Sequence, residues 1–129
     1  MKAKTAALTI GVIFIAVGLL GFVDNPIIGD SDNAIFHADT LHNWVHIGSG
    51  ILFVLVALAM PASASAVLVL FGIVYAILGV IGFFSIGSEG FGKVLGFLHI
   101  NGADNYLHIA LGLVIFLAGI ASRKVATTV

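Results

Sequence analysis

The chain has 129 residues, of which 60% are hydrophobic and 9% are charged, and its formal net charge is −1. A mean hydropathy of +1.22 excludes a disordered chain and an ordinary soluble domain, in which about a quarter of the residues are charged. The charge balance excludes a nucleic-acid-binding protein, and the lack of cysteine excludes disulfides, thiolate metal sites and iron–sulfur clusters. The composition therefore predicts a protein embedded in a lipid bilayer.

Four stretches are apolar and long enough to cross a bilayer as helices, which takes roughly 20 residues each. They are Thr5–Val23, Leu41–Met60, Ala64–Ser85 and Asp104–Ala121. Pro61 and Ser63 separate the second stretch from the third so closely that these two must form a tight helical hairpin. The first stretch ends without a small-x-small cleavage site, so we interpret it as a retained helix rather than a signal peptide. We expect a single integral membrane domain over residues 1–129.

The charged residues predict how the chain is oriented in the membrane. The basic residues that flank the spans lie at the two ends of the chain: Lys2, Lys4, Arg123 and Lys124. Because basic segments stay in the cytoplasm, both termini are expected there, in a multi-pass protein of the cell membrane. The two longer connections, residues 24–40 and 86–103, then face outward. They carry most of the acidic residues: Asp24, Asp30, Asp32, Asp39 and Glu89.

The two halves of the chain, residues about 5–60 and about 64–121, repeat one pattern. In each half a helix with a glycine face precedes a loop, and a second helix then begins with a polar box, HNxxH or DNxxH. The glycines recur after 61 positions, namely Gly11, Gly18 and Gly21 as Gly72, Gly79 and Gly82. The polar residues recur after 62 positions, namely His37, Asn43 and His46 as His99, Asn105 and His108, with His42 matched by Asp104. We predict an all-α, four-helix transmembrane bundle made of two parallel two-helix repeats, packed closely along the glycine faces.

All five histidines lie at or near the outer ends of the second and fourth predicted spans. A spacing of four residues puts His42 and His46 on one helix face, and it does the same for Asp104 and His108. The predicted symmetry sets the two pairs opposite each other. Three imidazoles and one carboxylate then form a four-coordinate set suited to Zn²⁺ or another divalent metal ion. The expected supporting residues around this candidate metal site are Asn43, Asn105, His37 and His99.

A purely structural interpretation of the same residues stays open. Polar side chains at helix starts commonly accept hydrogen bonds from unpaired backbone N–H groups. Asn43 and Asn105 are placed to bond across the bundle to histidines of the other repeat, which would hold the helices in register without a metal. The capping candidates are Asp39 or Thr40 for the second span, and a capping box of Asn101 with Asp104 for the fourth.

A haem is a further alternative, in which the protein is a membrane redox protein. His46 and His108 are equivalent in the two repeats, and two histidines on neighbouring helices can supply both axial ligands of a haem. Gly48, Gly50 and Gly112 are expected to leave room for the flat ring. A metal-dependent membrane hydrolase is a third class, which would need an open coordination position and a cavity for substrate.

Three aromatic residues and two loop segments complete the expectations. Tyr75 lies in the middle of the third span, where its hydroxyl needs a partner, so it should face inward. Trp44 and Tyr106 are equivalent in the repeats and are typical of aromatic residues at a membrane interface. The apolar loop segments Ala34–His37 and Phe91–His99 are expected to lie as short interfacial or re-entrant pieces.

The runs LHNWVH at 41–46, VLGFL at 94–98 and INGADNYLH at 100–108 together resemble the small four-span prokaryotic membrane proteins grouped as domain of unknown function 4383. The resemblance covers nearly the whole chain and implies the four-span fold and the paired boxes, but no activity. His37 and His99 depart from it, because apolar or small residues are expected there. We therefore expect a non-enzymatic membrane protein whose cluster is structural or binds a divalent metal, acting as an accessory or sensor subunit. Its expected partners are the lipid bilayer and a second copy or another membrane protein.

Overall fold

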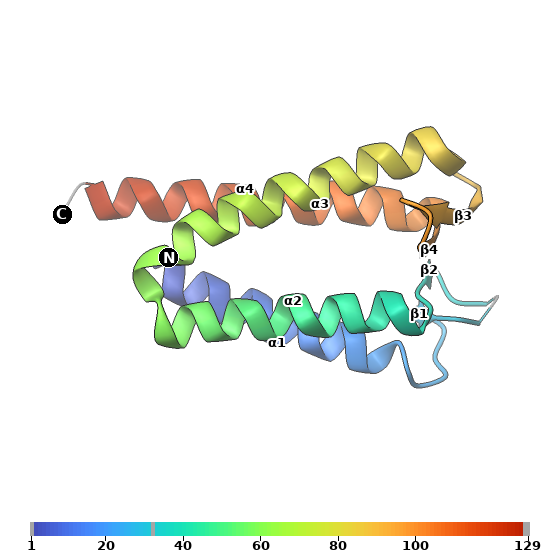
Figure 1. Cartoon of the computed structure of the whole chain (residues 1–129), viewed down its shortest axis with the longest axis horizontal. Coiled ribbons are helices and arrows are strands. Elements are labelled where there is room, and N and C mark those ends of the chain that lie inside the picture. The colour runs from blue at the N-terminus through green and yellow to red at the C-terminus, as the bar shows by residue number, and fades with distance from the viewer. Residues whose placement is uncertain (1, 32, 128–129) are drawn as a thin grey trace.

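The computed structural model describes residues 2–31 and 33–127, so Asp32 lies outside the described residues. Four long helices run nearly the full length of the molecule (Figure 1). They are α1 (Ala3–Leu20), α2 (Thr40–Ala59), α3 (Ala64–Ile86) and α4 (Gly102–Thr127). Each begins within two residues of a predicted span, and all four are long and apolar enough to cross a membrane. The prediction of four helices with the length and composition of membrane spans is therefore confirmed.

The helices pair as two hairpins. Helix α1 packs along α2 and helix α3 packs along α4, and contacts between the hairpins are much sparser than contacts within them (Figure 1). A short 3-10 turn, η1 (Pro61–Ser63), joins α2 to α3 and forms the predicted tight connection. The start of α1 and the end of α4 lie at the same end of the bundle as η1. The histidines are at the opposite end, which carries the strands.

Close backbone contacts hold each hairpin together at its glycines. A Cβ built on Gly50 of α2 would lie only 2.6 Å from the carbonyl oxygen of Gly11 in α1. In the other hairpin, a Cβ on Gly112 of α4 would lie 2.6 Å from the carbonyl oxygen of Gly72 in α3. No side chain larger than hydrogen fits at these points without moving a backbone. The residues of these two contacts correspond to one another in the aligned halves of the sequence.

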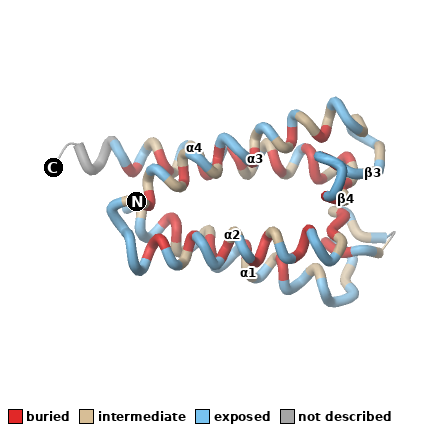
Figure 2. Tube along the Cα trace, viewed as in Figure 1, coloured by how far each residue is buried: buried red, intermediate tan, exposed pale blue. Residues whose placement is uncertain are grey.

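Aromatic side chains fill the middle of the bundle between the hairpins. The ring centroids of Phe14 and Tyr75 are 5.3 Å apart, and those of Phe53 and Phe71 are 4.9 Å apart. The hydroxyl of Tyr75, which is buried, donates a hydrogen bond to Ser49 Oγ at 3.1 Å. The expectation that Tyr75 faces inward and finds a partner is therefore confirmed. Figure 2 shows that buried positions recur along all four helices between exposed ones.

The connections at the histidine-bearing end contain short strands, which the sequence analysis did not predict. Strands β1 (Ile28–Gly29) and β2 (Phe36–His37) pair in parallel, and β3 (Phe91–Val94) and β4 (Leu98–Asn101) form an antiparallel hairpin. The backbone N–H and C=O groups of these loop segments therefore pair with one another, while their location at the membrane interface stays a prediction. Strands β2 and β4 contact each other beside the starts of α2 and α4 (Figure 1).

Candidate metal centre

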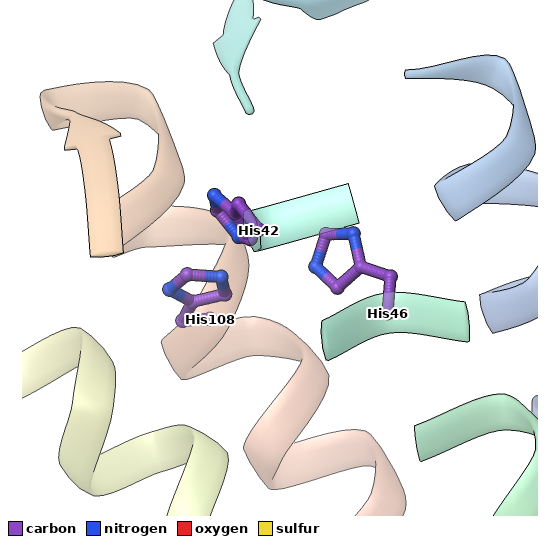
Figure 3. A group of neighbouring side chains, drawn as sticks. All are labelled: His42, His46 and His108. Carbon is purple, nitrogen blue, oxygen red and sulfur yellow. The ribbon is translucent and has the colours of Figure 1, made fainter. Parts of the chain in front are cut away.

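Three histidines from two helices meet at the strand-bearing end of the bundle. Helix α2 supplies His42 and His46 from one face, and α4 supplies His108. Their exposed fractions are 2%, 4% and 4%, and their candidate ligand nitrogens all lie within 4.8 Å of one another. Figure 3 shows the three rings turned toward one another. We call these residues the histidine triad.

The spacing within the triad is close to what a metal ion requires. A tetrahedral ion about 2.0–2.1 Å from each imidazole nitrogen places those nitrogens about 3.3 Å apart. One candidate nitrogen from each ring of the triad lies within 4.8 Å of the other two, so the rings would have to move closer together to hold an ion. The donor set also fits, because imidazole nitrogen suits Zn²⁺ and several other divalent transition ions.

A backbone carbonyl orients the first histidine of the triad. The ring Nδ1 of His42 lies 3.0 Å from the carbonyl oxygen of His99 in β4. A carbonyl oxygen can only accept a hydrogen bond, so Nδ1 is the nitrogen that carries the proton. The lone pair of a neutral His42 ring is then on Nε2. Metal-ligating histidines typically make such a bond through their second nitrogen, which fixes both the tautomer and the ring direction.

The other two histidines have unmet hydrogen-bonding capacity. His46 Nδ1 and His108 Nδ1 are buried, and neither has a hydrogen-bond partner among the described residues. Aromatic rings lie beside them instead, with Phe14 5.9 Å from His46 and Tyr75 5.9 Å from His108, centroid to centroid. A buried polar group left without a partner costs about 1–3 kcal/mol. Two nitrogens of the triad are therefore left without a hydrogen bond from the described residues around them, as expected where an ion or water completes a site.

Asp104, the predicted fourth ligand, is engaged at the start of α4. Its Oδ2 accepts a hydrogen bond from the backbone N–H of Asn101 at 2.8 Å, while its own N–H donates to Asn101 Oδ1 at 3.1 Å. This reciprocal pair is the predicted capping box. Asp104 is 1% exposed and does not belong to the group of three whose ligand atoms converge. The predicted cap of α2 is present too, because Asp39 Oδ1 accepts from the backbone N–H of His42 at 2.9 Å.

The two asparagines of the polar boxes do not make the expected bonds to histidines. Asn105 Nδ2 donates to the carbonyl oxygen of Gly87 at 3.0 Å, which lies at the end of α3 in its own hairpin. The side chain of Asn43 packs directly against Gly21, and that of Asn105 packs against Gly82. Both side chains therefore tie their helix to the glycine face of its hairpin partner. The physical reason is local, because a notch without a Cβ lies within reach of each amide.

Equivalent loops contact the helix starts of the opposite half. His99 of β4 bonds through its carbonyl to the ring of His42, and the backbone of His37 bonds to the carboxyl group of Asp104. The Asn101 side chain also donates to the carbonyl oxygen of Ile35 at 2.9 Å. Sequence reasoning missed these bonds, because no residue type signals which loop carbonyl will face a helix. His99 therefore contacts the triad through its backbone carbonyl, whereas the backbone of His37 contacts Asp104.

The imidazole rings of His37 and His99 lie in the strand layer beside the triad. Their ring centroids are 5.9 Å apart, and that of His37 is 4.4 Å from the ring of Phe91. His37 Nε2 is 3.7 Å from Asp30 Oδ1, and the side chains of these two residues are 8% and 79% exposed. The pair therefore connects a buried imidazole to an exposed carboxylate.

The glycines expected to make room for a haem do not all do so. Gly50 and Gly112 are used for helix packing, where the carbonyl oxygens of Gly11 and Gly72 fill the space beside them. A Cβ on Gly48, in contrast, would have nothing within 4 Å. The interior positions that were expected to accommodate a flat ring are thus occupied by the neighbouring helices.

Comparison with known proteins identifies one family. The family model described as Domain of unknown function (DUF4383) matches residues 4–121. No curated protein and no solved structure matches the chain.

Proposed function

We propose that this chain, which belongs to the family described as domain of unknown function DUF4383, is a non-enzymatic membrane protein that holds a divalent metal ion at His42, His46 and His108. The observation that carries the proposal is the convergence of three buried imidazoles. Within the part of the chain that the structure describes, two of these rings have a nitrogen without a hydrogen-bond partner, and the third is oriented by a carbonyl. A structural cluster would be expected to satisfy its own polar atoms, since leaving them unpaired lowers stability.

The proposed coordination uses three protein ligands rather than the four expected from sequence. Three neutral imidazoles leave the charge of a divalent ion uncompensated, which is costly in an apolar setting. Asp104 lies one helical turn before His108 and is buried, so its carboxyl group is available as a nearby counter-charge. We assign it that role, with water as the fourth ligand. Such a site suits a sensor or accessory subunit that responds to a metal ion.

The proposal includes the orientation and the origin of the bundle. The basic residues Lys2, Lys4 and Arg123 support a cytoplasmic location for both termini, which would place the triad near the opposite membrane surface; the side chain of Lys124 lies outside the described residues. The matched glycine contacts of the two hairpins support a duplicated two-helix unit. Labelling of single cysteines introduced near either end of the chain, in intact cells, would test the orientation.

Metal analysis of the purified protein tests the proposed function. The full chain is purified in detergent without chelator, its metal content is measured, and Co²⁺ or Zn²⁺ is titrated into the metal-free protein. We expect about one ion per chain and an increase in thermal stability, which amounts to about 2.7 kcal/mol when the free ion is at 100 times its Kd. His46→Ala and His108→Ala should each abolish both effects, whereas Asn43→Ala, at a non-ligating box position, should retain the ion.

Other outcomes would point to the alternatives. If wild type binds no ion and the histidine variants lose stability equally with and without added metal, the triad is structural and the proposal is wrong. An absorption spectrum of the same sample tests haem directly, because a Soret band shows bound haem, and its loss in His46→Ala and His108→Ala would assign these residues as axial ligands.

A further inference from the structure

We propose that His37 and Asp30 form a transient cation-binding site through which metal ions reach the histidine triad. This inference rests on the proposed function, since it requires an ion at the triad. It addresses access, because the triad histidines are at most 4% exposed and an ion cannot reach them directly from water. A buried metal site needs an access path lined by groups that can replace the water of hydration.

A sequence of polar contacts leads from the surface to the triad. The exposed carboxylate of Asp30 lies 3.7 Å from His37 Nε2, and the side chain of His37 is 8% exposed. The ring of His37 lies 5.9 Å from that of His99. The carbonyl of His99 is in turn 3.0 Å from the ring of His42, the first member of the triad. His37 and His99 thus stand between the exposed Asp30 carboxylate and the first residue of the triad.

The chemistry of the pair suits transfer rather than storage. A carboxylate and an imidazole are both ligands for divalent transition ions, and two ligands bind more weakly than three, so the ion can leave. Asp30 also lines a solvent-open hollow of about 210 Å³ together with Asp24 and Asn25. Acidic groups around such a hollow raise the local concentration of cations. Lys93 opposes this effect, because it stands directly across from His99 in the β3–β4 hairpin.

The test measures the rate of Co²⁺ uptake by the full chain in detergent, followed by visible absorption after rapid mixing. Asp30→Asn should slow both uptake and release about tenfold at low ionic strength, with the final Kd and stoichiometry unchanged. High salt should shrink the difference from wild type, because it screens the lost charge. His37→Ala should slow both rates as well. Glu89→Gln removes the same charge from an exposed position in the α3–β3 connection and should keep wild-type rates.

The outcomes separate this inference from the proposed function. If wild type binds Co²⁺ and His46→Ala abolishes binding, but Asp30→Asn and His37→Ala load at the wild-type rate, only the access route is wrong. It is equally wrong if these variants lose equilibrium affinity, because the pair would then belong to the final site. If wild type binds no Co²⁺, both proposals fail. Lys93→Gln gives an independent check, since loss of this cation should speed uptake, and slower uptake would contradict the electrostatic reasoning.

Discussion

The contact between α1 and α2 at Gly11 predicts a measurable loss of stability when this glycine is replaced by alanine. The new Cβ would lie 2.8 Å from the carbonyl oxygen of Gly50 and 2.9 Å from Val54 Cγ2, whereas ordinary contacts begin near 3.4 Å. The two helices would have to separate by about half an ångström, and overpacking of this kind costs about 1–3 kcal/mol. Gly48→Ala is the matched control, because nothing lies within 4 Å of its Cβ.

Both variants gain the same helix propensity, about 1 kcal/mol for glycine to alanine, so the difference between them isolates the packing cost. We expect Gly11→Ala to be less stable than Gly48→Ala by about 1–3 kcal/mol in reversible unfolding in mixed detergent micelles. Gly50→Ala should resemble Gly11→Ala, and the double variant should lose less than the sum, because the first separation makes room for the second methyl group. Equal stability of Gly11→Ala and Gly48→Ala would refute the close backbone contact.

The polar contacts give three further expectations. A double-mutant cycle of Tyr75→Phe with Ser49→Ala, measured by the same unfolding assay, should show a coupling of about 0.6 kcal/mol, as is common for hydrogen bonds between membrane helices; no coupling would contradict the bond between α3 and α2. Asn101→Ala should lower stability by at least about 1 kcal/mol, because it removes both the capping box and the bond to the Ile35 carbonyl, and a neutral effect would show that both bonds are dispensable. Acidification should release Co²⁺ from the wild-type protein, because a protonated imidazole has no lone pair for a metal; Co²⁺ absorption that is independent of pH would argue against histidine ligands.

The helices and their caps could be predicted from sequence because the signals are local. A single span of roughly 20 apolar residues forms a helix in a bilayer, because a helix satisfies its backbone hydrogen bonds internally. The number of such spans therefore predicts the number of helices. The caps at Asp39 and Asn101 depend on side chains that lie within three residues of the N–H groups they accept from. The strands could not be predicted in this way. Strands β1 and β2 are each two residues long, which is too short to show an alternating pattern of apolar and polar residues. Their pairing depends on the path of the loop.

The candidate site was predictable in part for the same reason. The spacing of His42 and His46 and the position of His108 in the second box were enough to suggest that the three imidazoles meet. The assignment of Asp104 as a ligand competed with the capping box that the sequence also predicted, and in the structure Asp104 Oδ2 accepts the bond from the Asn101 N–H. The carbonyl of His99 that orients His42 belongs to a loop backbone, whose direction depends on three-dimensional packing rather than on residue type.

The buried apolar core at mid-bundle has a consequence for ion exchange at the triad. Phe53, Leu68 and Ile115, each at most 1% exposed, close the bundle interior between the triad and the end that carries η1. An ion beside His42 would find only apolar side chains on the side toward η1, and it would have to leave at the strand-bearing end. If the triad holds an ion as proposed, that ion would exchange only with the compartment at the strand-bearing end of the bundle.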